Sequence, residues 1–600
     1  MPPDFAMFAL QGAKGINTKD TRSAIDDQEL AWQENFIRIG NGNLRTLWDV
    51  GTAVYTAPGG KTIVSHFFFN IGNTNYAAVF LADGTADAVN LSSGNTVTHI
   101  STVANTFFVS NGSRPAVQQW GSSGIVITST SQANGYWAWD NAAGGTLYSP
   151  GSFAPAWLSG FTTTSFTGNT HTTTTVDTLV PGTGTLVVGM GWTGTDIPAN
   201  DTIASIASGT SITIGPNPAT GTHAGTFQAQ WYMPTGISGD SIEVFQSHVF
   251  IYNSANGIGT FSAPGNGANF SAAQGGGTYT SADGFLKSGF HGVKQANGYL
   301  YPFGDSSINV ISNIQTSGSP ATTTFNNSNV DPQVGTPWRD SIQAFGRALI
   351  FANPLGIYGL FGSTAEKLSE KLDGVFTTAT LPVTGTAVPS AAVSTIFEQK
   401  CYLLLITITD PFTGQPRSAM ACWDGKTFFM ASQTKTLTYI STQEINSQPL
   451  AWGTDGNTLF PLFNAASSLL TKKLQTKLWA GSGFIIYKAA RTLYSQVQDN
   501  SGLGYTFSAL IDTDGLSGTT AITGNVSFSW VNGSGQAFTW KNGSNQAFTW
   551  GSAGNSIRGM DLGAASVTGL LLGITLTTTS PDFTLVSVGL GYRDNYSFLG

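Results

Sequence analysis

The sequence has little cysteine and no long apolar run, and each shortage excludes a class of protein. Only Cys401 and Cys422 occur among 600 residues, which excludes a disulfide framework. We predict that both are reduced, buried thiols that pack as small hydrophobic groups. The longest apolar runs, CYLLLIT and GLLLGITL, are far shorter than the roughly 20 residues of a membrane-spanning helix. We therefore expect no membrane-spanning segment.

Basic residues are also scarce. Lys and Arg number 25 against 33 Asp and Glu, and neither Lys nor Arg occurs between Arg114 and Lys287. A protein that holds nucleic acid concentrates basic residues, because these displace counterions from phosphates. The charge distribution therefore argues against tight binding of nucleic acid. It is compatible with DNA that slides past a neutral or acidic surface.

The N-terminal residues lack the pattern of a secretory signal. The run MPPDFAMFALQGAKG has no basic stretch ahead of an apolar one. We therefore expect the chain to fold in the cytoplasm of the cell that makes it.

Glycine, threonine and aromatic residues are abundant, and they favour an all-β fold. The chain has 73 Gly, 38 Phe and 15 Trp, and only 10% of its residues are charged. From about residue 50, apolar runs of four to seven residues are separated by Asn-Gly or Asp-Gly pairs, which supply the positive φ angles of hairpin turns. Hairpins are therefore expected to dominate.

The hairpins recur at a nearly constant spacing. In the second half, the positions His248, Tyr299, Ala348, Tyr402 and Leu459 mark starts that are 51, 49, 54 and 57 residues apart. Four-stranded propeller blades take about 40 to 50 residues each. The spacing predicts a β-propeller of six to eight blades over 51–158 and 233–500. Stacked β-sandwiches are the alternative, but they would not require a constant period.

A Thr-rich segment at 159–232 interrupts this period. It contains no Lys or Arg, and its short runs LVVGM, TIASI and SITIG are typical of brief strands. Threonines that alternate with apolar residues suit a sheet with one solvated face. We predict an inserted small β-sandwich domain that projects from the propeller.

The two ends of the chain differ from the middle. In 1–50, the run SAIDDQELAWQENF has Ser23 and Asp26 at capping-box spacing, and it predicts one short helix. In 501–600, a C-terminal β region contains FSW, FTW and FTW at ten-residue intervals, which predicts an aromatic ladder on neighbouring strands. An exposed aromatic platform is the alternative. The ladder residues are Phe528, Trp530, Phe538, Trp540, Phe548 and Trp550.

No motif in the sequence predicts catalysis or a cofactor or metal site. APGGKT lacks the first glycine of a phosphate loop, DTDG lacks most ligands of a calcium loop, and the six histidines are scattered. A carboxylate pair for glycoside cleavage could still form over a propeller opening. The candidates are Asp305, Asp331, Asp340 and Glu366. Because no local pattern ranks them, we expect a protein that is not an enzyme.

Four segments resemble proteins of bacteriophage particles. The run GINTKDTRSAIDDQELAWQENFIRIGNGNLRTLWDVG is similar to the start of tail nozzle proteins of short-tailed phages, and GTPWRDSIQAFGRALIFANPLGIYGLFGSTAEKLSEKLDGVF resembles one of their propeller blades. The Thr-rich insert and the NGSxQAFTW repeats resemble modules of other phage structural proteins. The residues that carry the N-terminal resemblance are Gly15, Asn17, Asp27, Glu29, Leu30, Asn35, Ile37, Leu44 and Arg45.

This resemblance implies a structural protein of the phage tail, assembled in the host bacterial cytoplasm. It implies a homo-hexamer below the portal, which contacts tail adaptor proteins and tail fibres or spikes, retains the packaged genome and lets double-stranded DNA pass without sequence-specific binding. On the same resemblance, Leu30, Trp32, Asn35 and Arg45 are candidates for adaptor docking. A receptor-binding or polysaccharide-degrading tail fibre or spike is the alternative, and the insert favours it.

Overall fold

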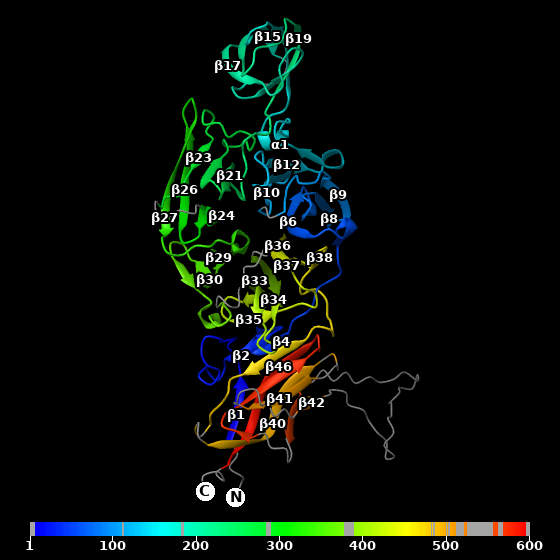
Figure 1. Cartoon of the computed structure of the whole chain (residues 1–600), viewed down its shortest axis with the longest axis vertical. Coiled ribbons are helices and arrows are strands. Elements are labelled where there is room, and N and C mark those ends of the chain that lie inside the picture. Colours follow the sequence, from blue (N-terminus) through cyan, green and yellow to red (C-terminus); the bar gives the residue numbers. More distant parts are fainter. Residues whose placement is uncertain are drawn as a thin grey trace, which may run out of the picture.

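The chain is β throughout its described parts. The computed structural model describes residues 6–110, 113–181, 185–283, 290–376, 389–481, 483, 486–499, 501, 505–511, 521–524, 556–561 and 568–595. These residues contain 46 strands, one four-residue α-helix, α1 (Ala156–Ser159), and four 3-10 turns. The expected all-β class is confirmed. A small barrel, a ring of sheets and a terminal β region follow one another along the long axis (Figure 1).

The middle part consists of seven four-stranded antiparallel units. The first three comprise β6 (Ile63–Ile71), β7 (Thr74–Leu81), β8 (Ala86–Asn90) and β9 (Thr96–Ser101); β10 (Ala116–Trp120), β11 (Gly124–Thr128), β12 (Tyr136–Asp140) and β13 (Thr146–Tyr148); and β20 (Ser241–Phe245), β21 (His248–Asn253), β22 (Ile258–Phe261) and β23 (Gly277–Tyr279). The next two comprise β24 (Phe290–Ala296), β25 (Tyr299–Gly304), β26 (Ile308–Ser317) and β27 (Thr322–Asp331); and β28 (Gln343–Phe345), β29 (Ala348–Asn353), β30 (Gly356–Leu360) and β31 (Ala365–Lys367). The last two comprise β32 (Ser390–Ile396), β33 (Gln399–Thr409), β34 (Pro416–Trp423) and β35 (Phe428–Ala431); and β36 (Tyr439–Ile445), β37 (Gln448–Thr454), β38 (Thr458–Pro461) and β5 (Tyr55–Thr56).

The seven units form a closed ring around their first strands. β6 contacts β10, β10 contacts β20, and β20 contacts β24. The circuit continues through the turn η3 (Arg339–Ser341) to β28, β32 and β36, and β36 contacts β6 again. This is the arrangement of a β-propeller with seven blades, within the expected range of six to eight. The remaining 3-10 turns are η1 (Pro58–Gly60), η2 (Ala142–Gly144) and η4 (Glu370–Leu372).

The ring is closed by a strand from the other end of the sequence. β5 pairs with β38, with Tyr55 opposite Leu459 and Thr56 opposite Thr458. The Tyr55 hydroxyl also donates a hydrogen bond to Asp87 on β8, at 2.6 Å. One short segment therefore completes the last unit and ties it to the first.

Four of the five predicted hairpin starts lie in the second strand of a unit, and the fifth lies in a third strand. His248, Tyr299 and Ala348 begin β21, β25 and β29, and Tyr402 lies in β33. Leu459, however, lies in β38, the third strand of its unit. The run TLFPLF, which begins with β38, is similar to the aromatic run YLYPFG of β25, whereas β37 has the sequence QPLAWGT with a single aromatic residue.

The inserted segment is a closed barrel and not the expected sandwich. Its strands are β14 (Thr164–Thr170), β15 (Thr175–Pro181), β16 (Gly191–Thr193), β17 (Thr202–Ser208), β18 (Ser211–Gly215) and β19 (Ala224–Gln230). They pair in the order β14-β15-β18-β17-β16-β19, and β19 pairs with β14 again. These few short strands cannot form two well-covered sheets. Closing one sheet on itself is favoured instead, since it removes both free edges. The stacked rings of Trp192 and Phe227, 5.5 Å apart, lie in its interior.

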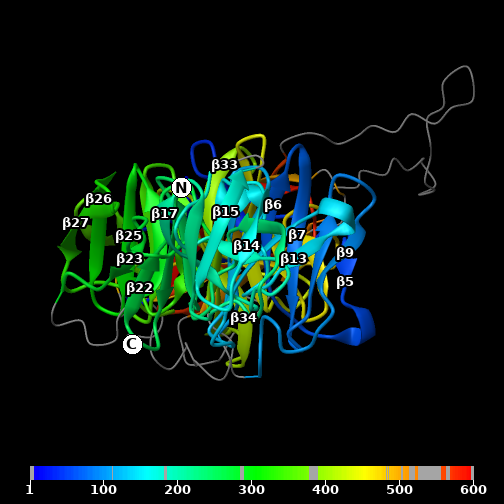
Figure 2. The ribbon, with the colours of Figure 1, turned by 90° about the horizontal axis from the view of Figure 1, so that it is seen from above.

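The barrel enters and leaves the ring at neighbouring points. Thr164 of β14 and Ala229 of β19 are register partners, and Phe153 bridges Tyr232 just below the barrel. Figure 2, which shows the chain from the barrel end, places the barrel between the unit β24–β27 and the unit β6–β9. The insert is thus attached through a narrow, two-stranded stem.

The predicted N-terminal helix is wrong. Residues 20–28 form turns and bends, and the chain then enters β2 (Leu30–Glu34), β3 (Phe36–Ile39) and β4 (Asn43–Thr46). The Glu29 carboxylate does accept a hydrogen bond from the Asp26 backbone N–H at 3.2 Å, as a capping residue would, but it caps a turn. Pairing of β2 with β39 (Lys472–Thr476) outweighs the local helix signal, because it buries Leu30 and Trp32.

The terminal β region contains strands from both ends of the chain. One sheet includes β1 (Ala6–Gln11), β3, β4, β40 (Tyr487–Asp499), β43 (Ser556–Asp561), β44 (Thr568–Gly569) and β46 (Phe583–Asn595). A second is nine-stranded, because β2 joins the blade β32–β35 to β39, β45 (Leu572–Thr578), β41 (Tyr505–Ile511) and β42 (Ala521–Gly524). The predicted aromatic ladder at Phe528, Trp530, Phe538, Trp540, Phe548 and Trp550 lies outside the described residues.

The narrow stem predicts that the barrel can be removed. We expect a chain in which Gly-Gly replaces residues 164–229 to keep the folded ring, because the removed ends are adjacent and the ring closes without them. Its thermal unfolding midpoint should fall by less than about 5 °C, the shift of roughly 1 to 2 kcal/mol in a large domain. Loss of cooperative unfolding, measured by calorimetry beside the full chain, would contradict this.

Candidate functional site

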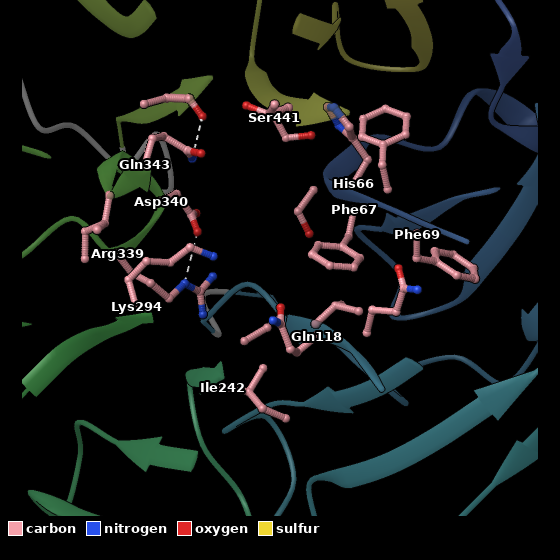
Figure 3. Close-up of a pocket in the computed structure, with 18 of the residues that line it drawn as sticks. His66, Phe67, Phe69, Gln118, Ile242, Lys294, Arg339, Asp340, Gln343 and Ser441 are labelled. Carbon is pink, nitrogen blue, oxygen red and sulfur yellow. Dashed lines mark hydrogen bonds and ion pairs between the residues drawn. The ribbon is translucent and has the colours of Figure 1, made fainter. Parts of the chain in front are cut away.

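A polar cavity lies on the axis of the ring. It encloses about 530 Å³, and its walls come mainly from the first strands of the units, β6, β10, β20, β24, β28, β32 and β36, together with η3 (Figure 3). Runs of consecutive residues from these strands line the cavity, among them 65–70, 115–119 and 441–444. The central cavity is the part of the ring where residues far apart in sequence meet.

An ion-pair cluster occupies one wall. The Asp340 carboxylate lies 3.0 Å from Nε of Arg339 and 3.3 Å from Nη1 of Arg114, and all three side chains are largely buried. The Arg114 guanidinium also lies 4.9 Å from the centre of the Tyr439 ring. Burial alone would raise the pKa of Asp340, but the two guanidinium groups together hold that pKa below its usual range. Asp340 is therefore a charged, fixed group.

A second carboxyl in the same cavity has the opposite character. Glu243 of β20 accepts a hydrogen bond from Gln118 at 3.1 Å and lies 3.4 Å from Nζ of Lys294. Its side chain is buried, and burial raises the pKa of the Glu243 carboxyl in spite of Lys294. Nearby, burial lowers the pKa of His66 to about 3, so its imidazole is neutral at physiological pH.

The structure does not bring the four candidate carboxylates together. Asp340 alone of the four lines the cavity. Asp305 pairs with His291 at 2.8 Å, Asp331 accepts the backbone N–H groups of the turn after β27, and Glu366 lies exposed on the outer strand β31. The expected pairing is absent among these residues because two of them belong to outer strands. Glu243 was missed, although a single acid within the apolar run SIEVF could have signalled it.

Other sequence features have simple structural roles. Lys61 of APGGKT follows the turn η1 and pairs with Asp83 at 2.7 Å. Cys401 and Cys422 are free and buried, as predicted. In the described part of the chain, no group of three His, Cys, Asp or Glu side chains is placed to hold a metal ion, and no helix is long and apolar enough to span a membrane. DTDG lies outside the described residues.

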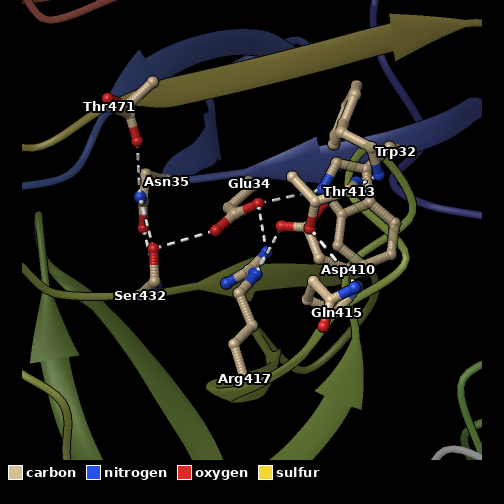
Figure 4. Close-up of polar contacts among 10 residues, drawn as sticks. Trp32, Glu34, Asn35, Asp410, Thr413, Gln415, Arg417, Ser432 and Thr471 are labelled. Carbon is tan, nitrogen blue, oxygen red and sulfur yellow. Dashed lines mark hydrogen bonds and ion pairs between the residues drawn. The ribbon is translucent and has the colours of Figure 1, made fainter.

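The predicted docking residues Trp32 and Asn35 lie in an internal junction (Figure 4). Trp32 donates its indole N–H to Glu34 at 3.0 Å. Asn35, which has a φ of 60°, donates to the Ser432 hydroxyl at 3.0 Å and to the Thr471 carbonyl at 2.8 Å. The junction therefore connects β2, the end of β35 and the approach to β39.

The other two predicted docking residues also make contacts within the chain. Leu30 is fully buried in the core of the terminal region. Arg45 lies 3.5 Å from Asp582, and its guanidinium lies 4.1 Å from the centre of the Phe397 ring. The four residues thus hold the N-terminal segment to the ring and the terminal region. Adaptor docking through them stays a prediction.

Arg417 neutralises two acids at this junction. Its Nη2 lies 2.7 Å from Glu34, and its Nε lies 2.6 Å from Asp410. Burial raises the pKa of Asp410, but the Phe412 backbone N–H and Arg417 more than offset this and lower that pKa. Both acids are almost fully buried. The junction therefore depends on a single guanidinium.

Comparison with known proteins does not assign the chain to a family. No family model and no curated protein matches the chain. Solved structures that are weakly similar to the chain include the following two. A Trypanosoma rangeli sialidase in complex with sialic acid has a TM-score of 0.26 and 10% identity, over 100% of this chain and 97% of that one. BBS1N in complex with ARL6DN has a TM-score of 0.24 and 7% identity, over 59% of this chain and 90% of that one. Likenesses at this level support no inference about function.

Replacing Arg417 should destabilise the whole chain. We expect Arg417→Met to lower the free energy of unfolding by about 3 to 5 kcal/mol, because it leaves two buried carboxylates without their cation. The matched control is Lys435→Met, which removes a half-exposed partner of Asp455 and should cost less than about 1 kcal/mol. Urea unfolding followed by tryptophan fluorescence measures both. Equal losses would contradict the role of the junction.

Glu243 should make stability fall as pH rises. Since its pKa is raised in the folded state, the folded chain binds more protons than the unfolded chain above pH 4.5, and stability is lost as pH rises through the folded pKa. We expect Glu243→Gln to be more stable than the original chain at pH 7, and the difference to shrink toward pH 4.5. Urea unfolding across this range measures it. A variant that is less stable at pH 7 would contradict the assignment.

Proposed function

We propose that this chain is a structural protein of a phage particle, the tail nozzle, which extends the DNA channel below the portal and adaptor. The observation that carries the proposal is the continuous nine-stranded sheet that joins a blade of the ring to the terminal β region. This shared sheet joins the ring and the terminal region into one rigid column, and the wall of a tube requires such rigidity. The resemblance of the N-terminal segment to nozzle proteins supports the same conclusion.

The channel must form between copies of the chain. One helical turn of duplex DNA is about 34 Å long. A cavity of about 530 Å³ that is lined by Arg339, Asp340 and Lys294 cannot hold it. DNA therefore does not pass through the axis of a single ring, and a conduit requires several chains around a common axis. Six copies are the number that the resemblance implies.

The surface chemistry suits passage without binding. The chain carries a net charge of −8, and the stretch from Pro115 to Leu286 has no Lys or Arg. Each contact of Lys or Arg with a phosphate releases counterions and strengthens DNA binding, and six copies would multiply this effect. Few such contacts let DNA slide. The adaptor, the tail fibres or spikes and the location in the virion are parts of this proposal.

The assembly state tests the proposal. Native mass spectrometry and class averages of the purified full-length chain should give closed rings of six times the 62.8 kDa chain mass, with a central opening between chains. Arg417→Met serves as a control for assembly that depends on correct folding. A trimer would support the fibre or spike alternative, and a monomer at every concentration would contradict the nozzle.

A further inference from the structure

The outer strands of the seven units differ greatly in length. β27 has ten residues and β9 has six, whereas β13, β23 and β31 have three each and β5 has two. The remaining outer strand, β35, pairs with β2. Within the described residues, no further strand pairs with the outer side of β27 or of β9. The ring therefore has two long free edges.

Neither long edge has the features that protect free edges in natural sheets, which are short strands, Lys, Pro or a bulge. The stretch 322–329 of β27 has no Lys, Arg or Pro, and it pairs with β26 without an extra residue of its own. The stretch 96–99 of β9 is equally regular against β8, and it exposes 47% of Val97. In contrast, the short outer strand β31 contains Glu366 and Lys367. Both long edges are thus open to pairing.

The two free edges lie on opposite sides of the ring. β9 belongs to the first unit and β27 to the fourth, so that they are three sevenths of a turn apart in the circuit. Figures 1 and 2 both show β27 and β9 on opposite sides of the molecule. They cannot pair within one chain. A contact between two different patches of identical chains is heterologous, and such contacts close into rings when the rotation between copies completes a turn.

Charge does not oppose a contact between these edges. No Lys or Arg occurs in 62–113 or in 295–338, the segments that contain β9 and β27. Asp331 ends β27, and His99 is the one titratable residue of β9. The two edges can therefore approach each other without repulsion between like charges. DNA, in contrast, would find no cation on either strand for its phosphates.

We propose that β27 of one copy of the chain pairs with β9 of the next copy, so that one sheet continues from ring to ring. The main-chain N–H and C=O groups of the two free edges then bond to each other, as in other cases of strand addition. The six residues of β9 span about 20 Å. The inference rests on the proposed function only in requiring that copies of the chain surround a common axis, and it does not depend on their number.

Cysteine cross-linking of the full-length chain tests the pairing. Val97→Cys and Thr324→Cys place one exposed thiol on each edge, while Cys401 and Cys422 are buried. With a short bis-maleimide, the double variant should give a ladder of covalent oligomers on a denaturing gel. Each single variant should stay monomeric, because a heterologous contact brings two different residues together.

The matched control moves one thiol off the edge. Leu355→Cys, combined with Val97→Cys, places the second thiol at a residue that is 65% exposed in the turn between β29 and β30. This pair should give no ladder, although it has the same number of exposed thiols. The unfolding midpoint of each variant verifies that the chain is folded.

Adding Lys to the edge is a second test. We expect Thr324→Lys with Asn326→Lys to weaken association at least about tenfold in native mass spectrometry, because Lys on an edge strand prevents pairing. Both residues are exposed, so the unfolding midpoint should not change. Ser363→Lys with Thr364→Lys adds the same charge at an exposed turn and should leave association unaltered.

The proposal is overturned if the chain assembles but the double variant gives no ladder, or if a single variant cross-links to itself. A ring of six copies without the ladder would leave the nozzle proposal intact. A ladder that ends at three copies would support this pairing and contradict the nozzle. A chain that stays monomeric at every concentration contradicts both.

Discussion

The pairing of β5 with β38 is the constraint on which the ring depends. The circuit of first strands closes where β36 meets β6, and the last unit obtains its fourth strand, β5, from a segment that precedes all the other strands of the ring in sequence. Tyr55 reinforces the closure, because its hydroxyl reaches Asp87 in the neighbouring unit. Closure in turn fixes the first strands around the axis. The position of every residue in the axial cavity follows from it.

The N-terminal segment links the ring to the terminal region as well. β1 pairs with β46, β2 lies between β35 and β39, and β5 closes the ring. Between these contacts, Glu34 and Asn35 connect the three elements through Arg417, Ser432 and Thr471. Parts that could have been separate domains therefore share strands, and rotation of one against the other would break buried hydrogen bonds.

The sequence predicted what depends on local pattern and failed where distant pairing decides. Asn-Gly turns and apolar runs were sufficient for the all-β class and for the repeating units. The helix expected after Ser23 failed, because its residues pair with β39, over 400 residues away in the chain. The sandwich predicted for the insert is wrong, because closure of the sheet into a barrel depends on the contact of β14 with β19. Glu243 and Asp340 meet only through the ring, so their opposite pKa shifts had no local signal.

The pairing of β1 with β46 has a consequence for synthesis. Ala6 and Tyr592 are register partners, so the sheet that contains them cannot form until synthesis has passed residue 592. A prematurely terminated product lacks β46, and its N-terminal strand keeps an unpaired edge. Incomplete copies would thus be distinguishable from finished ones by their fold.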